Sequence, residues 1–255
     1  MHDKPLTCSV ALCTYNGECL LQQQLDSLLA QTYLPDEIVV GDDASSDGTV
    51  AILQRFAARA AQAGVAVHLH CDGENAGFVE NFSRTVARAS GDVVFFCDQD
   101  DVWMPDKLLL VMRRFEREPK LLLACGDGVL IRGDGSDMGV DLFEALALTR
   151  AEREALGGGR AFDVLVRRSM TTGATAAFRR ELAALALPVG GGWLHDEWFA
   201  AVAAAMGPFA VLDEPLIAYG QHGGDQVERA NVPGWIDGVI CARPDVRSST
   251  WRYRG

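Results

Sequence analysis

The segment VVFFCDQDDVW, residues 93–103, joins an apolar run directly to three aspartates, Asp98, Asp100 and Asp101. Because side chains alternate along an extended segment, Asp98 and Asp100 point the same way and their carboxylates share one small region. Two bare carboxylates repel each other, whereas a hard divalent cation prefers oxygen ligands and keeps coordination sites for phosphate oxygens. The segment therefore predicts a strand that ends at a metal site for an anionic substrate. The alternative is a solvated strand end, since Asp is common in turns.

The same change from an apolar run to a helix-spaced run recurs along the chain, which predicts an α/β fold with parallel strands and helices on both faces of a sheet. Strands are expected in the runs 7–17, 36–43, 65–71 and 92–98, each followed by a helix, at 18–31, 49–63, 78–90 and 105–117. Further along we expect a strand at 121–131, loops with short helical pieces at 132–160, a strand and helix in 171–185, a helix at 195–206 and two short strands in 209–220.

Composition limits the classes of partner and compartment. The net charge of -12 and the absence of a basic block disfavour nucleic acid as a partner, so an anionic substrate needs a cation to bridge it. The seven cysteines form no CxxC pair, which favours a reducing compartment and argues against a structural zinc site. No apolar run approaches a membrane span or a secretory signal, so a cytoplasmic location is expected.

Polar residues follow each of the first four expected strands: Thr14, Tyr15 and Asn16; Asp42 and Asp43; Asn75 and Gly77; Asp98, Gln99 and Asp100. Ligands of parallel α/β sheets bind beyond the carboxyl ends of the strands, so these side chains are expected at one edge. The run GDDASSDGTV, residues 41–50, is a poor calcium loop, because Gln54 stands where a bidentate Glu is required. Asp42 or Asp43 is instead expected to bond a nucleobase imide or a ribose, while Ser46 or Asp47 caps the next helix.

Seven segments in this order resemble family 2 glycosyltransferases with the GT-A (Rossmann-like) fold, particularly their rhamnosyltransferase-like branch. They are VALCTYNG, QLDSLLAQTYLPDEIVVGDDASSDGT, NAGFVENFSRTVARASGD, FFCDQDDVWMPDKL, TTGATAAFRREL, HDEW and YGQHGGDQV. The resemblance implies a mixed, mostly parallel sheet flanked by helices over residues 1–228, with a nucleotide-binding half at about 1–101 and an acceptor-binding half at about 102–228. Residues 229–255 are expected to form a tail without a family counterpart.

The resemblance also implies an inverting transfer of a sugar from a nucleotide diphosphate donor to an acceptor hydroxyl, with Mg²⁺ or Mn²⁺ as the cofactor. Asp196 matches the catalytic base, and Asp100 and the late His222 match metal ligands. The expected donor-binding residues are Thr14, Tyr15, Asn16, Asp42, Asp43, Asn75, Gly77, Asp98 and Gln99. Trp103, Gly173 and Glu197 are candidates for the acceptor side. The branch suggests dTDP-rhamnose as donor and a growing surface glycan as acceptor; a lipid-linked acceptor would bring the enzyme to the inner face of the plasma membrane.

Structural roles compete with these functional ones. Asp196 also fits a helix-start acid, His222 a loop residue that bonds a carbonyl, and Trp103 a core aromatic. His195 and Asp196 replace the usual acidic pair of the family, so a one-residue shift of the alignment would exchange Asp196 and Glu197 as base.

Two other functions are compatible with part of the pattern. An apolar strand ending in DxDx also fits a haloacid dehalogenase-type phosphohydrolase, with Asp98 as nucleophile and Asp100 as acid/base. Against this, the motif lies on the fourth strand, and no later lysine and acidic motifs follow in the required order. A non-catalytic nucleotide-sugar binder is the second alternative, although the acids at 98, 100 and 196 are intact.

Overall fold

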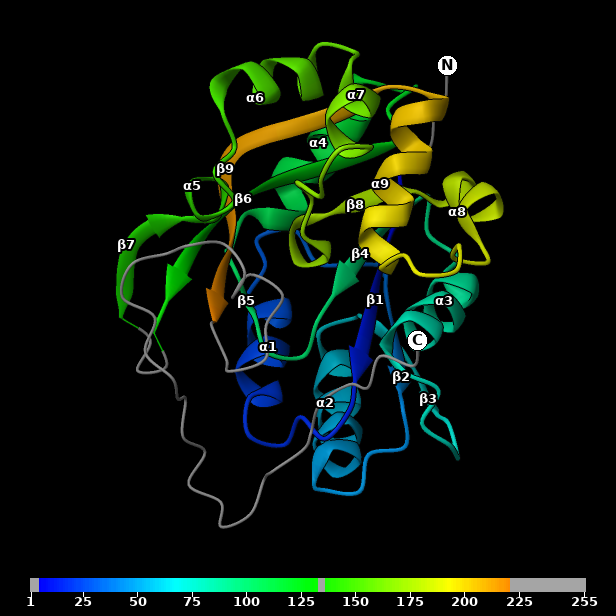
Figure 1. Cartoon of the computed structure of the whole chain (residues 1–255). Coiled ribbons are helices and arrows are strands. Elements are labelled where there is room, and N and C mark those ends of the chain that lie inside the picture. The colour runs from blue at the N-terminus through cyan, green and yellow to red at the C-terminus, as the bar shows by residue number, and fades with distance from the viewer. Residues whose placement is uncertain (1–4, 133–135, 221–255) are drawn as a thin grey trace.

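A computed structural model describes residues 5–132 and 136–220, and the chain is drawn in Figure 1. The strands are β1 (Cys8–Thr14), β2 (Glu37–Asp42), β3 (Ala66–Cys71), β4 (Val93–Cys97), β5 (Val102–Trp103), β6 (Leu123–Ile131), β7 (Asp137–Asp141), β8 (Ala177–Arg179) and β9 (Phe209–Gly220). The helices are α1 (Leu21–Leu29), α2 (Thr49–Gln62), α3 (Phe78–Arg88), α4 (Lys107–Arg117), α5 (Leu142–Ala145), α6 (Arg150–Gly157), α7 (Ala161–Leu165), α8 (Arg180–Ala186) and α9 (His195–Met206), with a 3₁₀ turn, η1, at Gly173–Thr175.

Within the described residues the strands form one mixed sheet in the order β3-β2-β1-β4-β8-β6-β9-β5, and β7 pairs with β6. Strands β3, β2, β1 and β4 are mutually parallel, as expected from their alternation with helices. Strand β8 runs antiparallel to both β4 and β6, so it joins the parallel half to the second half of the sheet. The predicted α/β class and mixed sheet are therefore confirmed.

Helices cover both faces because the central strands are apolar on both sides. Val10 and Leu12 of β1 pack with α1, α2 and α4, whereas Ala11 and Cys13 of the same strand pack with α3, α8 and α9. Every residue of β1, β2 and β4 is buried, which fixes these strands in the middle of the sheet. Strand β3 alternates between exposed and half-buried residues, as an edge strand does.

Three segments differ from the sequence prediction. The stretch 171–176 contains the turn η1, and the strand begins only at Ala177. Residues 209–220 form one strand, because a register shift opposite Gly126–Gly128 of β6 accommodates Pro215, which cannot donate a ladder hydrogen bond. At 132–160 the short helices α5 and α6 agree with the expected helical pieces, α6 starting with a capping box between Thr149 and Glu152, whereas the strand β7 was not expected. No helix in the described ranges is both long and apolar enough to cross a membrane.

Candidate functional site

The carboxyl ends of β1, β2 and β4 meet at one edge of the sheet, as predicted. The Thr14 hydroxyl donates to Asp42 Oδ2 at 2.8 Å, which ties β1 to β2. Gln99 ties β1 to the turn after β4, because its Oε1 accepts from the Tyr15 N–H at 2.8 Å and its Nε2 donates to the Tyr15 carbonyl at 3.1 Å. The side chain of Gln99 therefore holds the two strand ends together.

The paired aspartates after β2 also build the walls of this edge. Asp42 is 1% exposed and accepts from both the N–H and the hydroxyl of Ser45, at 3.0 and 2.5 Å. Asp43 is fully buried, and its two carboxylate oxygens accept from the N–H groups of Ala76 and Gly77 at 2.8 and 2.9 Å. Both carboxylates thus shape the loops in which they lie.

The neighbouring loops are fixed in the same way. Asn75 donates from Nδ2 to the Asp43 carbonyl at 3.2 Å, so the 75–77 loop is held beside β2. Asn16, at a φ of 48°, accepts the Ser46 N–H on Oδ1 at 2.9 Å. Asp47, rather than Ser46, bonds the start of α2, through the Thr49 N–H at 3.0 Å. The hydrogen bonds described above therefore tie the loops after β1, β2 and β3 together.

The acids after β4 provide an oxygen-rich turn. Asp98 and Asp100 are half-buried, whereas Asp101 is 3% exposed and belongs to the interior. Two accessible carboxylates suit a hard divalent ion whose remaining ligands are phosphate oxygens and water. In the ranges 5–132 and 136–220, no three side chains of the metal-binding types gather into a complete cage. The predicted third ligand, His222, lies outside the described residues.

Asp196 lies in the first turn of α9. Its Oδ2 accepts the Gly173 N–H at 2.8 Å, and its Oδ1 accepts the Glu197 N–H at 2.8 Å. Burial raises the pKa of Asp196, while these two backbone bonds counteract the shift. Burial also raises the pKa of Glu197, with a further contribution from the negative charge of Asp196. A raised carboxyl pKa suits a general base, which works best near the operating pH.

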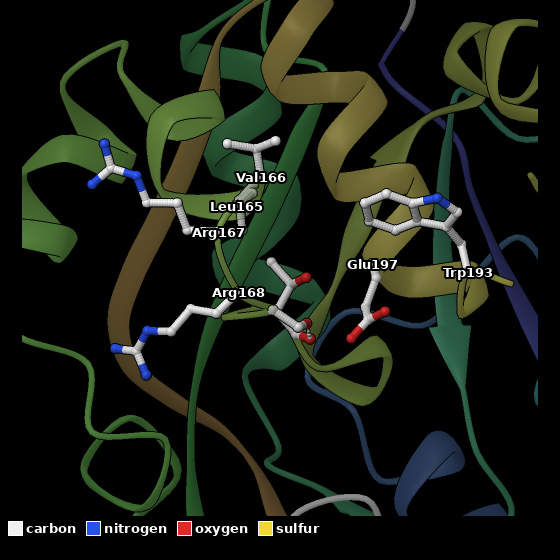
Figure 2. A pocket seen from close by; sticks show the side chains of 8 residues that line it. Leu165, Val166, Arg167, Arg168, Trp193 and Glu197 are labelled. Atoms are coloured by element: carbon white, nitrogen blue, oxygen red, sulfur yellow. Dashed lines mark hydrogen bonds between the residues drawn. The ribbon is translucent and has the colours of Figure 1, made fainter.

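A pocket of about 200 Å³, drawn in Figure 2, lies next to the start of α9. It is lined by Leu165, Val166, Arg167, Arg168, Ser169, Thr171, Trp193 and Glu197. Trp193 is 37% exposed, and the side chains of Arg167 and Arg168 extend away from Glu197 (Figure 2). Arg168 is held by Glu152 at 2.8 Å. The pocket thus offers an exposed aromatic ring and a carboxyl group next to the candidate base.

Two acceptor candidates take other positions in the structure. Trp103 is 2% exposed, its N–H donates to the Ser27 hydroxyl at 3.0 Å, and its ring is covered by the Lys107 ammonium. We therefore correct its assignment from an acceptor platform to a core residue. Gly173 is buried and gives its N–H to Asp196, so its contact is with the candidate base. Glu197 lines the pocket as expected of an acceptor-side residue.

Sequence reasoning did not predict the environment of three residues in this region. Trp193 follows the glycines at 190–192, and only this glycine run signals an exposed loop. His195 is buried and stacks on Phe82 with ring centroids 3.9 Å apart, and burial lowers its pKa to about 3. It is therefore a neutral core residue at neutral pH. Lys107 is completely buried at the start of α4, against the usual exposure of lysine.

Two relatives show which proteins the chain is similar to in sequence. An uncharacterised protein of Mycobacterium tuberculosis is 27% identical over 217 residues, which cover 84% of this chain and 58% of the relative, so this chain spans little more than half the relative's length. The dTDP-rhamnosyl transferase RfbG of Shigella flexneri is 32% identical over 100 residues, 38% of this chain and 34% of RfbG.

Among solved structures, the mannosyltransferase PcManGT of Pyrobaculum calidifontis, in complex with GDP-Man and Mn²⁺, has a TM-score of 0.64 and 22% identity, covering 85% of this chain and 57% of that protein. This likeness identifies the fold as GT-A. The model of the family described as Glycosyl transferase family 2 matches residues 9–183, which is more than half of the chain. The chain therefore belongs to glycosyl transferase family 2.

Proposed function

We propose that the protein is an inverting, metal-dependent glycosyltransferase that moves a sugar from a nucleotide diphosphate to an acceptor hydroxyl. The observation that carries this proposal is the position of Asp196. Its carboxylate is oriented by the Gly173 N–H at 2.8 Å, its pKa is raised by burial, and the next residue in the chain, Glu197, lines an open pocket. Family membership supports the same chemistry.

In this mechanism the donor lies across the ends of β1, β2 and β4, with Asp98 toward the ribose and Asp100 toward the diphosphate. A Mg²⁺ or Mn²⁺ ion held by Asp100, with His222 as the proposed further ligand, would neutralise charge on the departing diphosphate. The acceptor oxygen bonds to the anomeric carbon from the face opposite the diphosphate, as the bond from that carbon to the phosphate oxygen breaks. Attack from that face inverts the configuration at the anomeric carbon, and Asp196 takes the proton of the acceptor hydroxyl.

We further propose dTDP-rhamnose as the donor, a preference supported by the partial match to RfbG. The acceptor is a hydroxyl of a growing surface glycan, received in the pocket with Trp193 and Glu197. An exposed indole beside carboxyl groups suits a sugar, which has an apolar ring face and hydroxyl edges. A lipid-linked glycan would place the enzyme at the inner face of the membrane.

A donor screen tests the proposal. The protein is incubated with dTDP-rhamnose, UDP-GlcNAc, UDP-glucose and GDP-mannose, each with Mn²⁺ or Mg²⁺, and sugar release and transfer are followed by mass spectrometry. We expect turnover of one donor class, loss of turnover with EDTA, and recovery on adding the ion. No turnover or binding of any of these sugars would contradict the proposal. Turnover of simple phosphate esters without an acceptor would instead favour the phosphohydrolase.

A further inference from the structure

Lys107 stands out because every local preference opposes its position. It is the first residue of α4, where the helix dipole disfavours a cation, and its side chain has no exposure to solvent. Removing an ammonium ion from water costs several kcal/mol unless compensating contacts are made. Burial accordingly lowers the pKa of Lys107 to about 7, and the neighbouring Cys97, Asp101 and Asp98 oppose the shift.

The compensating contacts of Lys107 reach two separate parts of the site. Its Nζ lies 3.4 Å from the centroid of the Trp103 ring, within the segment that follows the acids of β4. The same Nζ donates a hydrogen bond to the carbonyl of Ala174, 67 residues along the chain. Lys107 therefore connects the donor-side turn with the turn η1.

The turn η1 is also the element that orients Asp196. The N–H of Gly173 donates to Asp196 Oδ2 at 2.8 Å, while the carbonyl of the next residue, Ala174, accepts from Lys107. Two adjacent residues of the turn, Gly173 and Ala174, are thus bonded to Asp196 and to Lys107 respectively. On the donor side, the segment 103–104 is held as well. Ser27 of α1 accepts the Trp103 N–H at 3.0 Å, and Gln31, just after α1, donates to the Met104 carbonyl at 2.8 Å.

We propose that Lys107 is a positioning residue that fixes the turn 173–175, and through it the carboxylate of Asp196, relative to the acids at the end of β4. This inference rests on the proposed role of Asp196 as base. A purely space-filling role would be met equally well by methionine, which has a similar length and needs no partner. Only a positioning role requires the terminal amino group, which donates the hydrogen bond to the Ala174 carbonyl.

The experiment compares Lys107→Met and Lys107→Gln with the wild type and with the control Lys120→Met, whose lysine is exposed. Hydrogen–deuterium exchange is measured on peptides covering residues 171–179 and, as an internal reference, residues 49–62. We expect faster exchange at 171–179 in Lys107→Met, a smaller increase in Lys107→Gln, which keeps an N–H donor, and no change at 49–62. This measurement needs no substrate, so it decides the structural part even if the proposed function fails.

Kinetics then test the consequence for transfer, with the sugar nucleotide of the donor panel that the wild type turns over. We expect Lys107→Met to lower kcat by roughly 10–100-fold, as small misplacements of catalytic groups do, with the donor KM changed less than about threefold. The acid limb of the kcat profile should move to higher pH, because a displaced turn weakens the Gly173 N–H bond that lowers the pKa of Asp196.

Opposite results overturn the proposal. A Lys107→Met protein with wild-type exchange at 171–179 and kcat within about twofold of the wild type shows that the ammonium positions nothing. If neither variant folds, or if kcat falls only in step with the folded fraction, Lys107 is a structural residue. If the wild type itself transfers no sugar while exchange at 171–179 still responds, the proposed function fails and the restraint on the turn stands.

Discussion

Replacing Asp196 with asparagine separates catalysis from folding in this site. Asparagine keeps a carbonyl oxygen for the Gly173 N–H, which Asp196 Oδ2 accepts at 2.8 Å, but it cannot take a proton from the acceptor. A positioned base contributes about 10²–10⁴-fold to the rate, or roughly 3–5 kcal/mol of transition-state stabilisation. We expect kcat to fall by that factor, while the Kd for the donor nucleotide, measured by titration calorimetry, stays within about threefold.

The same substitution, Asp196→Asn, should not lower the thermal stability of the protein. Burial raises the pKa of Asp196 in the folded protein above its unfolded value. The unfolded chain therefore loses this proton at lower pH, and ionisation of Asp196 destabilises the fold as pH rises through the two pKa values. At pH 8 the neutral asparagine should leave Tm unchanged or raise it.

The matched variant Glu197→Gln identifies the base. Glu197 is the neighbouring carboxyl group in the same helix turn. If Asp196 takes the proton, the substitution Glu197→Gln should lower kcat less than tenfold. Retained turnover in Asp196→Asn together with collapse in Glu197→Gln would move the role to Glu197. Retained turnover in both would refute carboxylate base catalysis here. Loss of donor affinity in Asp196→Asn would show that the substitution disturbs the whole site.

Three further predictions concern the metal, the acceptor and the pH dependence of stability. Asp100→Asn should raise the Mn²⁺ concentration for half-maximal turnover at least about tenfold, measured by metal titration after EDTA treatment, because a carboxylate ligand is lost. Trp193→Ala should raise the acceptor KM about 3–10-fold and leave donor hydrolysis unchanged, since a ring contact contributes about 0.5–1.5 kcal/mol; an unchanged KM would remove Trp193 from the acceptor site. His195 has a pKa of about 3 in the folded protein, so below about pH 6.5 the chain takes up a proton when it unfolds. The free energy of unfolding therefore decreases as the pH is lowered. Between pH 8 and pH 5, the decrease in the free energy of unfolding should be about 2 kcal/mol smaller in His195→Phe than in the wild type, as measured by thermal unfolding. The same pH dependence in both proteins would show that His195 does not cause it.

The donor side of the site was largely accessible to sequence reasoning. Parallel strands place their carboxyl ends together by geometry alone, so Thr14, Asp42 and Gln99 were expected at one edge, and they lie there. Their partners were not predictable, because an aspartate that follows a strand has the same sequence signature whether it bonds a ligand or a loop N–H. Asp43 accepts hydrogen bonds from the N–H groups of Ala76 and Gly77, and this pairing depends on how the 75–77 loop packs beside β2.

The sequence was enough to determine the α/β class, the parallel half of the sheet and the place of the donor edge. The features that decided this were the apolar strand runs, the helical spacing of apolar residues and the acids that follow β4. Those features depend on neighbours in the chain, which the sequence contains explicitly. Only the tertiary structure decided that Trp193 is exposed whereas Trp103 and Lys107 are buried, and that Gly173 orients Asp196. These contacts join residues 23 and 67 positions apart, and their geometry is set by how α4, η1 and α9 pack against the sheet.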